Sequence, residues 1–70
     1  MILNAGKLVH AFINNGLDEI SAFRIAAEYR NTVEIFDSLV HDDTTEQLIY
    51  QLSQRMYDEA IRIEMSYWEN

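Results

Sequence analysis

Two histidines and a scatter of carboxylates are the side chains of this 70-residue sequence that could bind a metal or transfer protons. His10 stands alone in the first segment, while His41 is followed directly by Asp42 and Asp43. Neither histidine has a second ligand at suitable spacing on the same helical face, and the acidic pair lacks the alternation of a calcium-binding loop. The sequence therefore predicts no metal site and no cofactor.

Groups for acid–base or nucleophilic catalysis are not arranged in a recognisable pattern either. Glu28, Glu34 and Asp37 could pair as acid and base, but the glutamate-plus-histidine helix spacing of carboxylate metal sites does not accompany them. The sequence has no cysteine, and no glycine-rich turn or nucleophile motif lies near either histidine. We therefore expect a protein that is not an enzyme.

The sequence as a whole predicts an all-α fold. We expect a compact small helical bundle with a single domain over residues 1–70. The chain has no proline and only two glycines, whereas strand-rich folds need more of these turn-forming residues. The expected helices are three short ones, over residues 2–14, 18–30 and 32–41, packed on one long C-terminal helix over 44–69. An uninterrupted helix over 18–41 is the alternative.

Local signals support these boundaries. Gly16 suits the left-handed position after the first helix, Asp18 can cap the second, and Asn31 with Glu34 has the spacing of a capping box. Within the second helix a shared apolar face is expected to enter the core. This face contains Ile20, Phe23, Ala26 and Ala27.

The long C-terminal helix has more apolar surface than one contact needs. Its expected core stripe contains Leu48, Ile49, Leu52, Met56, Ala60, Ile63 and Tyr67. A second stripe, about a third of a turn away, contains Tyr50, Tyr57, Ile61, Met65 and Trp68, with Glu64 beside it. Tyrosine, tryptophan and methionine are enriched at interfaces, so we interpret this stripe as partner-binding. Coverage by the chain's own core is the alternative.

The formal net charge of −7 limits the kinds of partner that the protein is expected to bind. Surfaces that bind phosphate need clustered lysine and arginine, so direct nucleic-acid binding is disfavoured, whereas a basic protein surface would be attracted. Most carboxylates have structural roles at helix starts or in i,i+4 pairs such as Arg24–Glu28. Asp37, Asp42 and Glu64 have no such role, and we add them to the expected partner-binding residues.

These features lead to an expected function and two alternatives. We expect a protein–protein interaction module, a small acidic inhibitor or adaptor of the phage type that occupies the basic surface of a nucleic-acid-handling protein. One alternative is a structural homodimer, whose long helices pack on each other. Another is a degenerate helix-turn-helix over residues 25–33, disfavoured because acidic residues would occupy its recognition helix. No apolar stretch reaches 18 residues and no leader pattern is visible, so we expect a cytoplasmic protein without membrane contact.

Overall fold

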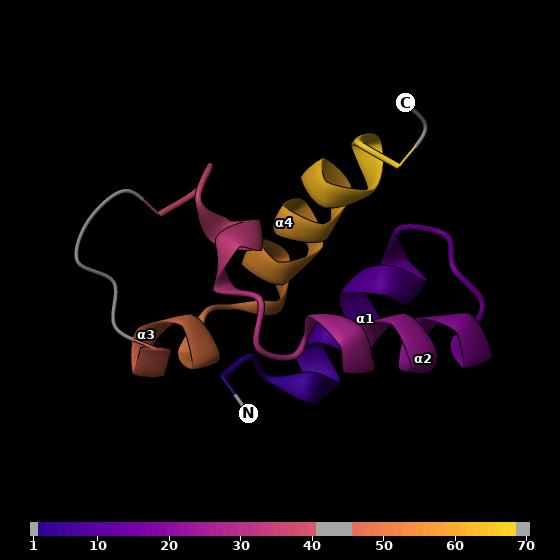
Figure 1. Cartoon of the computed structure of the whole chain (residues 1–70), viewed down its shortest axis with the longest axis horizontal. Coiled ribbons are helices and arrows are strands. Elements are labelled where there is room, and N and C mark those ends of the chain that lie inside the picture. Colours follow the sequence, from indigo (N-terminus) through magenta and orange to yellow (C-terminus); the bar gives the residue numbers. More distant parts are fainter. Residues whose placement is uncertain (1, 41–45, 69–70) are drawn as a thin grey trace.

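The computed structural model describes residues 2–40 and 46–68, and every regular element within these ranges is helical. The prediction of an all-α, compact helical bundle is confirmed (Figure 1). The described elements are α1 (Ala5–Asn14), α2 (Glu19–Tyr29), the 3-10 helix η1 (Val33–Phe36), α3 (Glu46–Gln51) and α4 (Gln54–Ser66).

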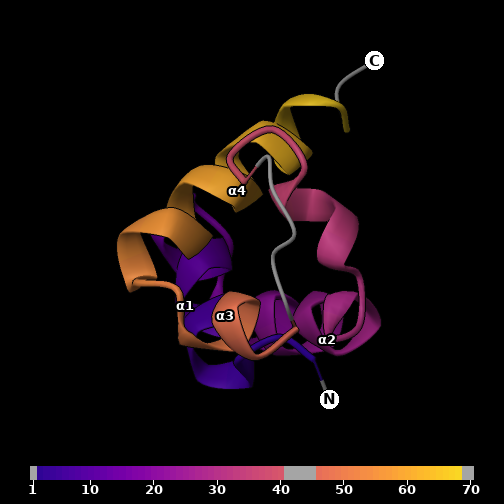
Figure 2. The same cartoon turned by 90° about the vertical axis from the view of Figure 1, so that its left-hand side faces the viewer.

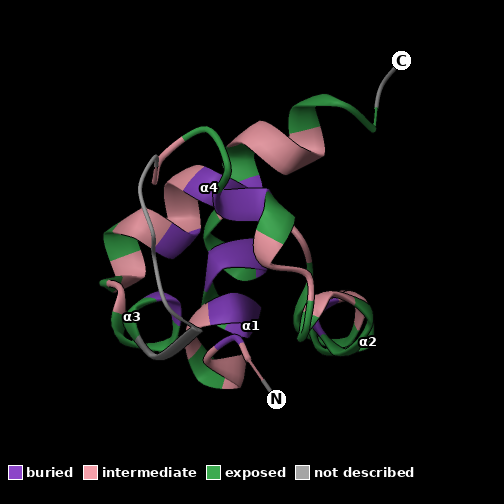
Figure 3. Cartoon of the chain, turned by 60° about the vertical axis from the view of Figure 1, so that its left-hand side comes forward, coloured by how far each residue is buried: buried purple, intermediate pink, exposed green. Residues whose placement is uncertain are grey.

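Helix α1 is the central element, because it packs against α2 on one side and against α4 on another. The 3-10 helix η1 packs on α4. Helix α3 lies at the end of the molecule opposite the C-terminal end of α4 (Figures 1 and 2). Buried positions gather on α1 and α4, whereas the outer side of α2 is largely exposed (Figure 3). The largest fully buried side chains are Tyr57, Phe12, Phe36, Leu3, Leu8 and Ile61.

The predicted end of the first helix and start of the second are confirmed. Gly16 has a φ of 109°, its N–H donates to the Ile13 carbonyl at 3.0 Å, and the Leu17 N–H donates to the Phe12 carbonyl at 3.1 Å. This pair of bonds is the Schellman pattern that satisfies the last carbonyls of a helix. Asp18 then caps α2 by accepting a hydrogen bond from the Ser21 N–H at 3.2 Å.

The expected third helix over 32–41 is only partly present. The predicted break at Arg30–Asn31 is real, which removes the alternative of one helix over 18–41. Only residues 33–36 are helical after it, in 3-10 geometry, and residue 41 lies outside the described residues. Asn31 does not form the predicted cap, because its side-chain oxygen accepts a hydrogen bond from the Ile2 N–H at 3.2 Å. This hydrogen bond between distant residues occupies the Asn31 side chain, so that side chain does not cap η1.

The prediction of one long helix over 44–69 is wrong. The chain breaks at Leu52–Ser53, where Ser53 begins α4 by accepting a hydrogen bond from the Met56 N–H at 3.3 Å. The Lys7 ammonium group donates to the Leu52 carbonyl at 2.7 Å, just beyond the end of α3. A serine cap and a cation at a helix C-terminus each stabilise a helix end. Together they favour two helices over a single one.

The break allows α4 to place Tyr57 in the interior. The Tyr57 hydroxyl donates to the Ile49 carbonyl of α3 at 2.8 Å and accepts from the Asn4 N–H at 3.0 Å. Its ring meets the Phe36 ring edge-on, with centroids 4.9 Å apart. One side chain therefore connects α4, α3, η1 and the residue that caps α1.

Candidate interaction surface

The predicted partner-binding stripe does not form a surface in this structure. Tyr57 and Ile61 were expected to face a partner, and both are fully buried. Tyr50 is 46% exposed, but it belongs to α3, which the break separates from α4. Met65 is half-buried against the core. The expectation failed because the core accepts the side of α4 that carries Tyr57 and Ile61, whereas Tyr67 of the predicted core stripe is 65% exposed.

Trp68 combines an internal contact with an exposed side. Its ring stacks on the buried Phe12 ring with centroids 6.0 Å apart and an interplanar angle of 22°, and it remains 42% exposed. Phe12 also contacts the Tyr29 ring at 5.8 Å. The tryptophan therefore covers part of the protein's own core, which is a structural role that the partner-binding interpretation did not include.

The three acidic residues that were predicted to bind a partner do not lie together on one described surface. Glu64 accepts a hydrogen bond from the Tyr29 hydroxyl at 2.9 Å, so it joins α4 to α2. Asp37 is exposed directly after η1, and Asp42 lies outside the described residues. The expected Arg24–Glu28 pair is not formed; in the described part of the chain, the recorded ion pair joins Arg62 to Glu59. The structure thus gives Glu64 a stabilising role and leaves Asp37 free for solvent.

The Tyr29–Glu64 contact predicts a loss of stability in alkali. Burial, and then the Glu64 carboxylate, raise the pKa of Tyr29 above its ordinary value of 10.0. A raised folded-state pKa contributes stability that is present below pH 10 and is lost as the pH rises through that folded-state value. Urea unfolding between about pH 8 and pH 11 should therefore show a smaller decline for Tyr29→Phe than for the unmodified protein. Equal declines would show that Tyr29 ionisation does not matter.

An exposed apolar face on α2 was not expected. Ile20 is 71% exposed, Phe23 is 60% exposed and Ala27 is also exposed, although all three were predicted to enter the core. The buried residues of α2 are Ala22 and Ala26. The core therefore accepts the side of α2 that carries Ala22, Ala26 and the partly buried Ile25 and Tyr29, whereas Ile20 and Phe23 are exposed.

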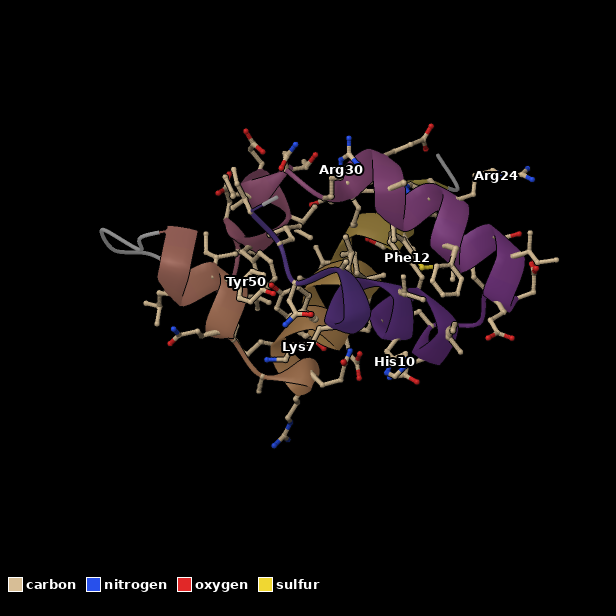
Figure 4. The ribbon with its side chains drawn as sticks, turned by 90° about the horizontal axis from the view of Figure 1, so that it is seen from below. Lys7, His10, Phe12, Arg24, Arg30 and Tyr50 are labelled. Atoms are coloured by element: carbon tan, nitrogen blue, oxygen red, sulfur yellow. The ribbon has the colours of Figure 1, made fainter. Side chains whose placement is uncertain are left out.

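Beside this face, α1 and α2 enclose a groove with a volume of about 290 Å³. The α1–α2 groove is lined by Ala5, Gly6, Val9, His10, Phe23, Ala26, Ala27 and Arg30. Four of these residues are alanine or glycine, so the hollow exists because neither helix supplies large side chains at the crossing. Figure 4 shows the two helices side by side from below.

One imidazole and one guanidinium group belong to the lining of the groove. His10 and Arg30 are the polar residues of its lining, and Figure 4 shows them on opposite outer sides of the helix pair. Arg24 is also exposed, but it is not part of the lining, because a rotation of about 100° from Phe23 places it on the side of α2 that carries Glu28. Across residues 2–40 and 46–68, neither arginine has a carboxylate partner. An apolar hollow whose lining includes one unpaired arginine, Arg30, thus lies on a protein of net charge −7.

Within the described ranges, no three His, Asp and Glu side chains lie together in a group that could hold a metal ion. The same part of the chain contains no helix with the length and apolar character needed to cross a membrane. Comparisons with protein-family models, with curated proteins and with solved structures give no match for this chain. The physical character of the groove is therefore the basis for assigning a function.

A sequence signal for the groove does exist. On a helical wheel α2 has two apolar sides, one with Ala22, Ile25 and Tyr29 and the other with Ile20 and Phe23. The expectation considered only the side with Ile20 and Phe23 and assigned it to the core. Two apolar sides on an 11-residue helix are themselves an indication that one of them lies at the surface.

Proposed function

We propose that this protein is a non-enzymatic protein-interaction module that acts by binding a partner through the α1–α2 groove. The exposure of Phe23 beside a hollow that it helps to line is the observation that carries this proposal. An aromatic side chain next to a pocket is the typical composition of a binding hot spot. The groove takes the place of the α4 stripe as the contact surface.

The available apolar area is sufficient to matter for binding. Fully burying a phenylalanine or isoleucine side chain contributes about 1.5–3 kcal/mol, and Phe23 and Ile20 are each more than half exposed. Covering both would therefore contribute roughly 2–4 kcal/mol, or about a 30-fold to 1,000-fold change in affinity. An inhibitor or adaptor that acts by occupying a surface is consistent with this contribution.

A homodimeric assembly subunit is the second candidate, because a second copy could cover the same exposed side chains. Among soluble oligomers symmetric dimers are the commonest form, and their contact uses one patch on both subunits. Light scattering at tens of micromolar protein distinguishes the two candidates. A dimer that Phe23→Ser converts to a monomer would favour assembly, whereas a monomer favours binding to a different protein.

Quantitative capture of partners from a lysate of the native host tests the proposal. The comparison uses the unmodified protein, Phe23→Ser in the groove, and Tyr67→Ser as the control, because Tyr67 is 65% exposed and lies just after α4. We expect at least one protein to be captured by the unmodified protein and the control but to be lost with Phe23→Ser. Equal capture by all three proteins would contradict the groove as the binding surface.

A further inference from the structure

We propose that Asn15 is a site of spontaneous deamidation and that the native fold controls the rate of this reaction. Deamidation replaces the side-chain amide with a carboxylate and releases ammonia. Molecules in which the end of α1 opens are thereby converted to an aspartate or isoaspartate form with a less stable fold. This modification site is separate from the α1–α2 groove and does not depend on its binding role.

The residue that follows Asn15 favours the reaction. Asn15 is the only asparagine of the chain that is directly followed by glycine, whereas Asn4, Asn14 and Asn31 are followed by alanine, asparagine and threonine. In deamidation the backbone nitrogen of the following residue must reach the side-chain amide carbon, and a side chain on that residue hinders the approach. Glycine has no Cβ and the widest choice of backbone conformations. An unfolded chain therefore reaches the reactive geometry most readily at Asn15.

The reaction requires only water in addition to the chain. The Gly16 nitrogen gives its proton to solvent and bonds to the Asn15 Cγ, while the Cγ–Nδ2 bond breaks and the Nδ2 group leaves with a proton as ammonia. Water then opens the resulting succinimide ring, and the Gly16 nitrogen regains its proton. Opening at Cγ gives aspartate, and opening at the Asn15 backbone carbonyl gives isoaspartate. An intramolecular attack of this kind depends on the two reacting atoms adopting a near-attack geometry.

The native structure keeps both reacting groups occupied. The Gly16 N–H donates to the Ile13 carbonyl at 3.0 Å, so its nitrogen is released only when this turn opens. The Asn15 Nδ2 group donates to the Ala11 carbonyl at 2.8 Å and to the Asp58 carbonyl at 3.1 Å. These bonds hold the amide toward the preceding turn of α1 and toward α4, whereas Gly16 follows Asn15 in the chain.

Opening of the end of α1 is the step that releases these groups. Gly16 is exposed and has open space where a side chain would lie, so hydrogen bonding protects the site and burial does not. Leu17 closes this end, because its N–H donates to the Phe12 carbonyl at 3.1 Å and its partly buried side chain packs on the core. A reaction that is much slower than opening and closing follows the equilibrium population of the open state. The deamidation rate should therefore report the fraction of molecules in which this end of α1 is open.

The product is expected to have a less stable fold. A carboxylate has no N–H, so the Ala11 and Asp58 carbonyls lose the donor that they share. The new negative charge lies at the C-terminal end of α1, where the helix dipole disfavours an anion. Isoaspartate also adds a carbon atom to the main chain inside the turn that Leu17 closes. Each modified molecule consequently opens more readily, as when chemical modification makes unfolding irreversible.

Deamidation of the whole protein in native buffer and in guanidinium chloride tests the proposal. Samples are held at the same mildly alkaline pH and temperature, and mass spectrometry of digests measures aspartate and isoaspartate at each asparagine over time. We expect Asn15 to react fastest of all the asparagines in the unfolded chain. In native buffer the Asn15 rate should be lower by about 10-fold or more, because only a small fraction of folded molecules has this helix end open.

Leu17→Ala separates control by the fold from the local chemistry, because it leaves the Asn15–Gly16 pair unchanged. In native buffer it should accelerate deamidation about 3-fold or more, since loss of a partly buried side chain raises the open fraction. In guanidinium chloride it should leave the rate unchanged. Ile20→Ala is the matched control, because this aliphatic side chain is 71% exposed, and it should change neither rate.

Asn15→Asp imitates one of the two products and tests the loss of stability. Its urea unfolding midpoint should be lower than that of the unmodified protein. Asn31→Asp is the matched control, because it adds the same charge but keeps the side-chain oxygen that accepts from the Ile2 N–H. The midpoint of this control should change less than that of Asn15→Asp.

Each part of the proposal has an outcome that overturns it. Equal Asn15 rates in native buffer and in guanidinium chloride, or a native rate that Leu17→Ala leaves unchanged, would show that the fold does not control the reaction. Faster deamidation of another asparagine in the unfolded chain would remove the assignment to Asn15. An Asn15→Asp protein as stable as Asn31→Asp would contradict the expected loss of stability in the product.

Discussion

Replacing Phe12 with alanine is expected to destabilise the protein by about 3–5 kcal/mol, as removal of a buried aromatic ring does. Phe12 is completely buried, and its ring is sandwiched between contacts to Tyr29 and Trp68. A domain of 70 residues has roughly 4–10 kcal/mol in total at 0.05–0.15 kcal/mol per residue. This single change should therefore leave the protein marginally folded or unfolded at room temperature.

Urea unfolding followed by tryptophan fluorescence measures this effect, because Trp68 is the single tryptophan and stacks on Phe12. Phe12→Leu keeps most of the side-chain volume and should cost less than about 1.5 kcal/mol, so it preserves a measurable transition. Phe23→Ala is the matched control, since the same residue type is 60% exposed there, and it should change stability by less than about 0.5 kcal/mol. Similar losses for Phe12→Ala and Phe23→Ala would contradict the assigned core.

The structure around Phe12 is also the part that the sequence predicts best. The end of α1 depends on Gly16 and Leu17, which bond back to carbonyls three and five residues earlier. The start of α2 depends on Asp18 and Ser21, which are three residues apart. Signals of this range are contained in a short window of sequence, so the local pattern is enough to locate these helix ends.

The break between α3 and α4 was visible only in part. Ser53 is a good cap, but it also fits the interior of an amphipathic helix, and no proline or glycine marks the position. The decisive contacts come from far along the chain, because Lys7 bonds to the Leu52 carbonyl across 45 positions and Asn4 bonds to Tyr57 across 53. A helical wheel cannot include such contacts, and the prediction therefore placed Tyr50 on the same helix face as Tyr57.

The α1–α2 groove could not be located from the sequence for a different reason. Its lining is drawn from two helices, and the orientation of α2 decides that Ala22 and Ala26 face α1 while Phe23 faces outward. Both sides of α2 are apolar, so the hydrophobic pattern alone does not choose between them. The packing of α1 between α2 and α4 makes that choice, and the exposed side is the one that carries the candidate function.

The net charge is also an incomplete guide to binding, because counting residues does not show which charged groups are already paired. Counting residues gives −7 and suggests a basic partner, but the structure pairs Arg62 with Glu59 and commits Lys7 to a carbonyl. Arg30, which lines the groove, has no carboxylate partner within the described ranges. Recognition at close range depends on which charges lie at the contact, whereas net charge mainly affects the rate of encounter. The net charge alone therefore does not identify the chemistry of a partner.

Replacing Tyr57 with alanine is the second change for which we expect a very large effect, about 4 kcal/mol or more. The change removes a fully buried ring that contacts Phe36, and it leaves the Ile49 carbonyl and the Asn4 N–H without their partner. Loss of the ring costs about 3–5 kcal/mol, and an unsatisfied buried polar group costs about 1–3 kcal/mol where water does not replace the bond.

Tyr57→Phe separates these contributions, because it keeps the ring and removes only the hydroxyl group. We expect a loss of about 1–3 kcal/mol in urea unfolding, whereas Tyr50→Phe, at a tyrosine that is 46% exposed, should have little effect. A folded and nearly unaffected Tyr57→Ala protein would show that Tyr57 is not the junction of the fold, and it would restore the hypothesis that this residue faces a partner. A graded series, with Tyr57→Ala worse than Tyr57→Phe and both worse than Tyr50→Phe, would show that both the buried ring and the hydroxyl group of Tyr57 stabilise the fold.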